Sequence, residues 1–189
     1  MPKSTLIKEK FKTYTIQFIK EIIPVIAGIL IALFIDNWNS ERKDKIYINQ
    51  VFSTIDNELK ETKEDIKATI PKQESLIDSL EFYSDKNASV LDVVMKSKGI
   101  YMPQIKINAW KSVSSAKIDL IDYNKITSLS NIEELKGTLN NKTEFLMNFL
   151  YSNLNNTDKD KKQTLKMLLL DILQTEKTLQ KSIELFEKK

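Results

Sequence analysis

The residues that could support catalysis in this chain of 189 residues are few, because it contains neither histidine nor cysteine. Their absence removes the commonest general base, the thiol nucleophile and the usual transition-metal ligands. Ser114 and Ser115 lie near Lys111 and Lys117, and a lysine can activate a serine hydroxyl, but both residue types are abundant here. The sequence also lacks a glycine-rich phosphate loop and a metal-ligand cluster. We therefore expect no catalytic residues, no metal, no cofactor and no enzymatic activity.

Glu21 is the ionisable residue with the most informative position, since it directly precedes a long apolar stretch. A carboxylate at the edge of a membrane span is costly if it faces lipid, and residues so placed commonly have a role. We interpret Glu21 as a polar contact at the interface or between subunits, with Lys20 as its neutralising partner. A role in proton or ion movement is the alternative. Asp36 and Trp38 mark the other edge, where an indole ring can lie among lipid headgroups.

The apolar stretch itself runs from Ile22 to Ile35 and organises the chain. It holds fourteen uncharged residues, ten of them Ile, Leu, Val or Phe, and no side of a helix through it is polar. At about 1.5 Å per residue they cover roughly 21 Å of a roughly 30 Å bilayer core, and apolar residues from Tyr14 onwards extend the stretch. We predict a transmembrane helix over residues 22–38. A helix buried in a soluble core is the alternative.

Charge is distributed unevenly along the chain. Residues 1–21 carry five Lys and two Glu, whereas the remaining 168 residues carry 24 basic and 24 acidic side chains. A neutral C-terminal part argues against nucleic acid as a partner. The basic N-terminus favours a cytoplasmic start and a periplasmic C-terminal domain in a Gram-negative bacterium. No small-x-small cleavage motif follows Ile35, so an uncleaved signal anchor in a single-pass inner-membrane protein is expected.

Two features suggest further contacts of the N-terminal region. Residues 1–21 form a basic amphipathic cytoplasmic segment, which lies either on the membrane surface or in solution as an extension of the span. Its apolar residues recur every three or four positions: Ile7, Phe11, Tyr14, Phe18 and Ile22. Within the span, Ala27, Gly28 and Ala32 permit close helix contact. The expected partners are therefore the lipid bilayer and either further copies of the chain or a larger membrane-protein complex.

The rest of the chain, residues 39–189, predicts an extramembrane antiparallel helical bundle, so the fold class is all-α. The span is expected to continue as a long, coiled-coil-like helix that ends at Pro71. The charged residues 58–64 are expected to lie on a solvated face of this helix and to form ion pairs between residues four apart. Its stripe comprises Ile48, Phe52, Ile55, Leu59, Thr62 and Ile66. The later expected elements are short helices at 72–83, from Ser89 to a stop at Gly99, and near Trp110, an extended piece at about 100–107, and two long final helices. The apolar stripes predicted for the two final helices comprise Leu129, Ile132, Leu135, Leu139, Leu146, Phe149 and Leu150 in the first, and Leu165, Leu169, Ile172, Leu179, Ile183 and Phe186 in the second.

The string IAGILIALFIDNWN, from Ile26 to Asn39, resembles a family of short single-pass inner-membrane proteins of unknown function from Gram-negative bacteria. The likeness includes a Glu-Ile pair at Glu21, the Gly-Ile-Leu-Ile-Ala-Leu core from Gly28 and the Asn-Trp-Asn end. Asp36 departs from it, because the family usually has Asn there. The resemblance covers about residues 15–65 and implies an anchored helical domain without a particular activity.

Two functions are compatible with these features. The first is a membrane-anchored interaction or scaffold protein, either self-assembling or an accessory subunit of a membrane complex. The second is a ligand-sensing periplasmic bundle that signals through a partner, with Tyr101 and Trp110 lining a pocket. Core packing is the simpler interpretation of Trp110.

Overall fold

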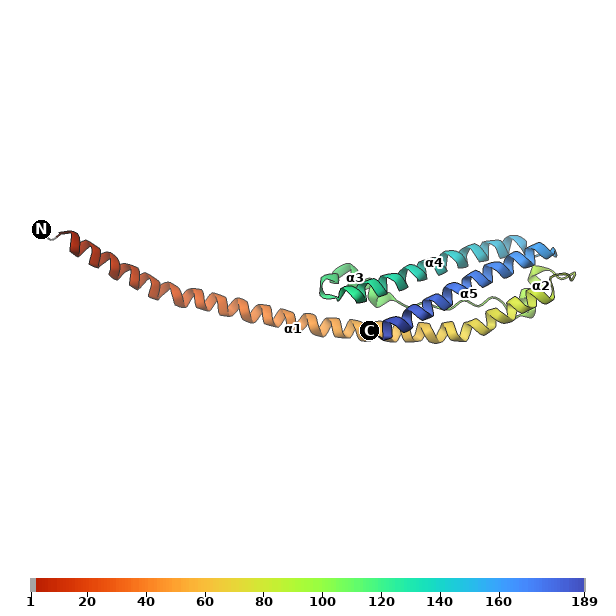
Figure 1. The fold of residues 1–189 in the computed structure, drawn as a ribbon, viewed down its shortest axis with the longest axis horizontal. Helices are drawn as coiled ribbons and strands as arrows, with labels where there is room; N and C mark the ends of the chain where they lie inside the picture. The colour runs from red at the N-terminus through yellow and green to blue at the C-terminus, as the bar shows by residue number, and fades with distance from the viewer. Residues whose placement is uncertain (1–2, 189) are drawn as a thin grey trace. The chain divides into compact units, whose positions relative to one another are not determined.

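The computed structural model describes the backbone of residues 3–188 and the side chains of residues 18–188. The described chain is helical and contains no β-strand, which confirms the predicted all-α class (Figure 1). Its helices are α1 (Lys3–Phe82), α2 (Val90–Lys96), α3 (Asn108–Ala116), α4 (Tyr123–Asn153) and α5 (Lys159–Glu187), with a short 3-10 helix at Ile118–Leu120. The side chains of the predicted amphipathic face before Phe18 lie outside the described residues.

The chain divides into two compact units, Met1–Ile48 and Asn49–Lys189. The first unit is built from the N-terminal part of α1, and the second contains the remainder of α1 and all later helices. The predicted end of the span, at residue 38, and the division between the units both fall within α1. All buried hydrophobic side chains of the described chain, from Ile55 onwards, belong to the second unit.

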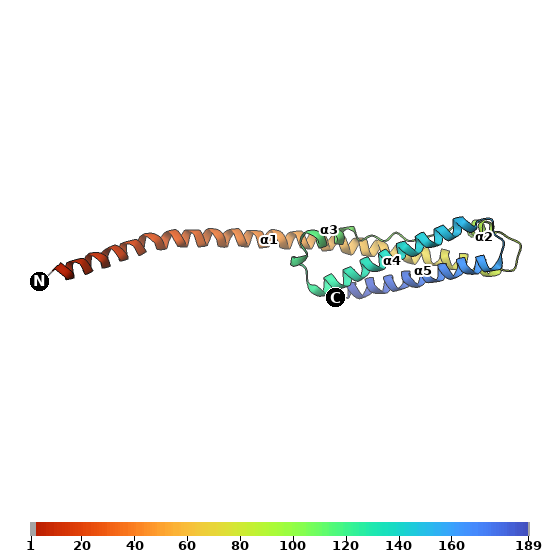
Figure 2. The same cartoon turned by 90° about the horizontal axis from the view of Figure 1, so that it is seen from above.

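The core of the second unit is formed by one face each of the C-terminal part of α1, α4 and α5, which lie side by side (Figures 1 and 2). Apolar residues at helical spacing exclude water along all three segments, and their burial is the main contribution to folding. Fully buried members are Ile55, Leu59, Ile66 and Leu80 of α1, Leu129, Ile132 and Leu146 of α4, and Leu165, Leu169, Ile172, Leu179 and Ile183 of α5. The stripes predicted for these helices are confirmed at these positions.

Pro71 does not end α1, so the predicted break and the separate helix at 72–83 are wrong. A proline inside a helix removes one backbone hydrogen bond and crowds the preceding turn. Here Pro71 is exposed, while the buried positions Ile66, Thr69, Gln73 and Leu76 continue the same spacing on both sides of it. Packing of both flanking turns against the core therefore holds the helix together through the proline.

The predicted start and stop of α2 are both present. The Ser89 hydroxyl accepts a hydrogen bond from the Asp92 N–H, and the Asp92 carboxylate accepts one from the Ser89 N–H, which forms a capping box. After Lys96 the chain turns through Lys98 and Gly99, whose φ angles are +64° and +101°. Gly99 thus supports the turn, as expected, although Lys98 takes the first left-handed position.

A buried lysine fastens the C-terminal end of α1 to the start of α5. The Lys162 side chain is fully buried, and its ammonium group donates hydrogen bonds to the backbone oxygens of Tyr83 (3.0 Å), Ser84 (3.4 Å) and Lys86 (2.7 Å). Three acceptors match the three N–H bonds of an ammonium group, and carbonyls near a helix C-terminus favour a cation. This contact fixes the loop between α1 and α2.

We expect Lys162→Met to lower the free energy of unfolding by about 2–4 kcal/mol, because the three carbonyl oxygens lose their donor in a buried site. Lys166→Met is the matched control on the same helix. It removes an ion pair between Lys166 and Glu81 at the surface and should lower the free energy of unfolding much less, because solvent screens such a pair. Urea unfolding of the full chain in detergent, followed by circular dichroism, measures both. Equal effects of the two substitutions would contradict a structural role for Lys162.

Candidate functional site

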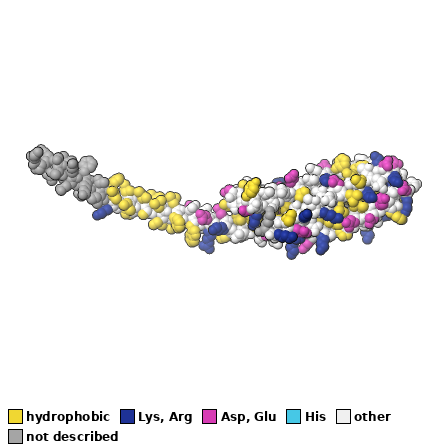
Figure 3. All heavy atoms as spheres, viewed as in Figure 1, with side chains coloured by type: hydrophobic (Ala, Val, Ile, Leu, Met, Phe, Trp, Pro, Cys, Tyr) yellow, Lys and Arg dark blue, Asp and Glu magenta, His cyan; other side chains and the backbone are white. Residues whose placement is uncertain are grey.

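The N-terminal unit exposes apolar side chains around the circumference of α1. Twelve large apolar residues between Phe18 and Trp38 are each 48–74% exposed. Figure 3 shows hydrophobic side chains covering the visible face of this part of the helix. By length and composition the helix could cross a membrane, since its most apolar 18-residue window has a mean hydropathy of 2.4 and no buried residue. A signal sequence near an N-terminus has the same properties. This surface is the first candidate site.

The edge and contact residues predicted for the span all lie on this exposed surface. Lys20 and Glu21 precede its apolar part, Asp36 and Trp38 follow it, and all four side chains are exposed. The small residues Ala27, Gly28 and Ala32 are exposed as well. Apart from its chain neighbours and the adjacent backbone of its own helix, a Cβ atom added at Gly28 would meet no atom of the described chain within 4 Å. The small-residue face is therefore open to contact from another molecule.

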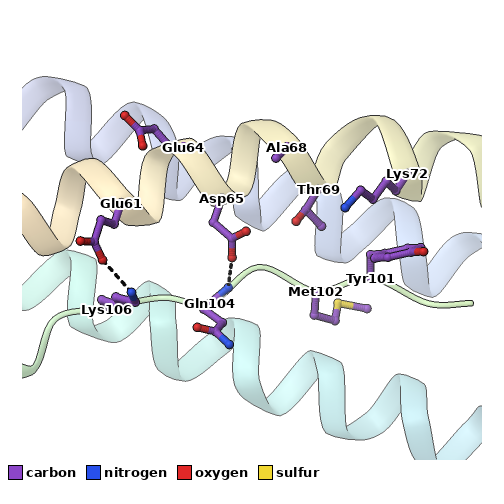
Figure 4. A pocket seen from close by; sticks show the side chains of 10 residues that line it. All are labelled: Glu61, Glu64, Asp65, Ala68, Thr69, Lys72, Tyr101, Met102, Gln104 and Lys106. Carbon is purple, nitrogen blue, oxygen red and sulfur yellow. Dashed lines mark hydrogen bonds and ion pairs between the residues drawn. The ribbon is translucent and has the colours of Figure 1, made fainter.

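The second candidate site involves residues 100–107, a segment without regular structure that we call the strap. Three α1 side chains, Thr62, Asp65 and Gln73, bind its backbone. Thr62 Oγ1 accepts a hydrogen bond from the Lys106 N–H at 2.9 Å and donates one to the backbone oxygen of the same residue at 3.3 Å. The Asp65 carboxylate accepts a hydrogen bond from the Gln104 N–H at 2.6 Å (Figure 4). A segment outside helices and sheets needs such partners for its backbone groups.

Helix α3, which follows the strap, is held in the same way. The carboxylate of Glu58 on α1 accepts the N–H of Ala109 at 3.1 Å, whereas the N-cap residue Ile107 makes no side-chain cap. A negative charge at a helix N-terminus is favourable because the first N–H groups lack partners within the helix.

The charged residues 58–64 are thus more than a solvated face. Glu61 pairs with Lys106 and Lys63 pairs with Glu187, each at 2.6 Å. These partners are distant in sequence, so the ion pairs of Glu61 and Lys63 are not the pairs four residues apart that we predicted for this face. The polar residues Thr62 and Gln73 on the buried face of α1 are the sequence signal that could have indicated this role, since each occupies a core position.

A groove of about 630 Å³ lies between α1 and the strap (Figure 4). Its lining combines charged and amphipathic side chains: Glu61, Glu64, Asp65, Ala68, Thr69, Lys72, Tyr101, Met102, Gln104 and Lys106. The Lys72 ammonium lies 4.6 Å from the centre of the Tyr101 ring, a cation–π contact. The groove therefore presents charged groups beside an aromatic ring.

Tyr101 and Trp110, the residues predicted to share a pocket, occupy different environments. Tyr101 lines the groove, whereas Trp110 is not among its lining residues and is only 1% exposed. The Trp110 indole N–H donates to the Glu133 carboxylate at 2.9 Å, which satisfies its polar atom within the fold. The contacts of Trp110 are those of a core residue.

Behind the strap, Gln73 of α1 and Glu176 of α5 form a buried polar pair. The Gln73 amide donates to Glu176 Oε1 at 2.8 Å and to the backbone oxygen of Tyr101 at 3.0 Å. Gln73 is 1% exposed and Glu176 fully buried. Burial raises the pKa of Glu176 from 4.5 to about 7. The hydrogen bond from Gln73 lowers this pKa, but by less than burial raises it. Nothing in the sequence around Glu176 distinguishes it from a surface glutamate.

The serine–lysine arrangement has a structural explanation in α3. The hydroxyls of Ser114 and Ser115 both donate to the backbone oxygen of Lys111, at 3.3 and 3.1 Å. Such bonds within a helix are common for serine. Among residues 18–188 no group of three Asp, Glu, His or Cys side chains is arranged to hold a metal ion.

Comparison with known proteins adds no assignment: no protein family, curated protein or solved structure matches the chain.

The titration of Glu176 has a measurable effect on stability. Since its pKa is raised in the folded state, the folded chain holds a proton that the unfolded chain has lost between about pH 4.5 and 7. The free energy of unfolding should therefore fall with rising pH across this window, with a slope of at most about 1.4 kcal/mol per pH unit. Glu176→Gln should remove this slope in urea titrations of the full chain in detergent.

The exposed α4 variant Glu144→Gln is the matched control and should keep the slope. Three other carboxylates, Glu81, Asp85 and Asp92, have lowered pKa values. The main causes are hydrogen bonds from Lys166, Lys159 and Ser89, respectively. Their titration therefore changes the free energy of unfolding only at a pH below this window. An unchanged slope in Glu176→Gln would assign the titration to a different residue.

Proposed function

We propose that this protein is a membrane-anchored helical scaffold, either self-assembling or an accessory subunit of a membrane complex. A single transmembrane helix over residues 22–38 holds it in the bilayer, and the C-terminal unit mediates interactions outside. The observation that carries this proposal is the apolar circumference of α1 between Phe18 and Trp38, which the rest of the described chain does not bury.

The energetics of transfer favour lipid around this segment. Ten Ile, Leu, Val or Phe residues, at about −0.3 to −0.6 kcal/mol each, contribute roughly −3 to −6 kcal/mol to insertion. In water, the same exposed surface would be an aggregation site far larger than a soluble monomer usually presents. Lys20 and Trp38 are suited to the two interfaces, by snorkelling and by headgroup contact respectively.

The orientation follows from charge. The five lysines of residues 1–21 favour retention of this segment in the cytoplasm, which directs the C-terminal unit to the periplasm of a Gram-negative cell. The resemblance of residues 26–39 to single-pass inner-membrane proteins agrees with this direction.

For the C-terminal unit we propose an antiparallel helical bundle that joins the span through α1. Contacts between α1 and α5 support this arrangement, because positions later in α1 pair with positions earlier in α5. The pairs are Lys63 with Glu187, Gln73 with Glu176, and Glu81 with Lys166. Such a bundle offers long exposed helix faces for protein contact, and Ala27, Gly28 and Ala32 offer a face for self-association within the membrane.

A ligand-sensing role is the second candidate. The groove beside Tyr101 favours it, since it combines an aromatic ring with charged side chains in a space of about 630 Å³. Titration of the purified chain with polar metabolites, followed by thermal stability, tests this role. A stabilisation that Tyr101→Ala abolishes, in a chain that still folds, would favour sensing over scaffolding.

The anchor is tested by extraction of cell membranes with alkaline carbonate. The wild-type chain should stay in the membrane pellet and retain its N-terminal segment by mass spectrometry. The double change Ile29→Lys with Leu30→Lys should release it, since each central lysine costs about 2.5–3.5 kcal/mol and the two offset the gain from the whole span. Tyr151→Lys with Met167→Lys, at exposed positions of the C-terminal unit, is the control and should stay bound. A soluble or shortened wild-type chain would contradict an uncleaved anchor.

Topology can be measured cleanly because the chain has no native cysteine. A thiol at Ser152→Cys, on α4, should react with a membrane-impermeant maleimide in cells whose outer membrane is permeabilised. A thiol at Ser4→Cys should react only after the inner membrane is opened, because the basic segment is retained inside. The opposite labelling pattern would reverse the proposed orientation.

A further inference from the structure

The buried pair of Gln73 and Glu176 is connected directly to the strap. The amide nitrogen of Gln73 serves three acceptors: Glu176 Oε1 at 2.8 Å, the backbone oxygen of Tyr101 at 3.0 Å and the Met102 sulfur at 3.8 Å. Gln73 therefore links α5, α1 and the strap at one point, and its orientation is set by what Glu176 can accept or donate.

The pair also has two unused atoms. Among the described residues, neither Gln73 Oε1 nor Glu176 Oε2 has a hydrogen-bond partner, and both atoms are buried. A carboxylate and an amide oxygen are both acceptors and cannot bond each other, whereas a protonated carboxyl carries an O–H donor. A neutral Glu176 can therefore donate from Oε2 to Gln73 Oε1 while Oε1 accepts from the amide. This reciprocal acid–amide pair satisfies both atoms with one proton.

We propose that Gln73 and Glu176 form a proton-operated latch on the strap. With the proton bound, the reciprocal pair is closed and Gln73 holds the Tyr101 end of the strap against α1. When Glu176 releases its proton, Gln73 Oε1 faces an anionic oxygen, the pair opens, and the Tyr101–Met102 part of the groove wall is freed.

The charged form is disfavoured because, among the residues whose side chains are described, the nearby cations are engaged by other groups. On α1, Lys72 lies over the Tyr101 ring and Glu74 pairs with Lys177 of α5. On α4, the Lys142 ammonium is held by Asp171 and by the Thr175 hydroxyl. The strap presents the Tyr101 phenol and, farther along, Lys106, which pairs with Glu61. Burial of Glu176 is the main cause of its raised pKa.

Release is confined to one end of the strap. Thr62 and Asp65 hold the backbone at Lys106 and Gln104 independently of the latch. At the other end the strap begins beside Gly99, whose φ of +101° marks a turn. An open latch should therefore loosen Tyr101 and Met102 while the later part stays attached. This device uses contacts of the C-terminal unit alone and does not rest on the proposed membrane anchor.

Near-neutral pH is normally sensed by histidine, which this chain lacks. A pH response of the strap in this range would therefore come from a carboxyl group whose pKa is raised by its surroundings, as that of Glu176 is. Glu176→Gln is the informative variant, because its amide can both accept from and donate to Gln73 and so keeps the pair closed at every pH.

A nitroxide at Tyr101→Cys, in the otherwise cysteine-free full chain in detergent, reports the strap's mobility. Between about pH 5.5 and pH 8.5 the ratio of mobile to immobile spectral components should rise, by up to about tenfold per pH unit, with a midpoint at about pH 7. Added Glu176→Gln should hold the label immobile throughout. A label at Ser152→Cys on α4 should not respond.

Hydrogen exchange of the strap peptide in the unlabelled chain provides the second measurement, independent of the Tyr101 substitution. After correction for intrinsic exchange, protection at residues 101–103 should fall at alkaline pH in the wild type and persist in Glu176→Gln. A pH-independent strap in both measurements, or the same pH response in Glu176→Gln, would overturn the latch.

Discussion

Apolar surface must be removed from water, and α1 meets this requirement differently along its length. In the C-terminal unit its apolar residues occupy one stripe, so neighbouring helices cover them and the opposite face stays polar. Between Phe18 and Trp38 the apolar residues surround the helix, and no single neighbour could cover them. The described chain leaves them exposed, so their cover has to come from lipid or from other protein molecules. The scaffold proposal depends on this difference.

The second constraint concerns the strap, whose backbone has no helix or sheet to pair with. Thr62 and Asp65 supply partners for it, and Glu58 supplies one for the start of α3. Charged residues of α1 that look like ordinary surface residues in the sequence therefore position the one irregular wall of the groove. Any ligand or partner that used this groove would contact a surface whose shape these side chains maintain.

Two buried ionisable side chains illustrate opposite outcomes of polar burial. Lys162 is charged and has an acceptor for each of its N–H bonds, so its burial fixes a loop. Glu176 has one donor for two oxygens, so its charged form is poorly satisfied and its neutral form is favoured. The first arrangement leaves no N–H bond of the ammonium group without an acceptor, whereas the second is sensitive to a single proton.

The sequence by itself determined what depends on local pattern. Helical spacing identified the core residues of α5, such as Leu165, Leu169 and Ile183, and Ser89 marked the start of α2. The uniform apolarity of residues 22–35 likewise predicted a segment that could cross a membrane, because hydropathy needs no knowledge of neighbours.

Only the tertiary structure decided the features that rest on distant contacts. Helix α1 continues through Pro71 because core packing on both sides outweighs a local break. Glu58 meets Ala109, Trp110 meets Glu133, and Gln73 meets both Tyr101 and Glu176, across separations of 23 to 103 residues. A polar side chain becomes a cap, a core residue or a titrating group according to the partner that folding brings to it, and spacing along the chain does not specify that partner.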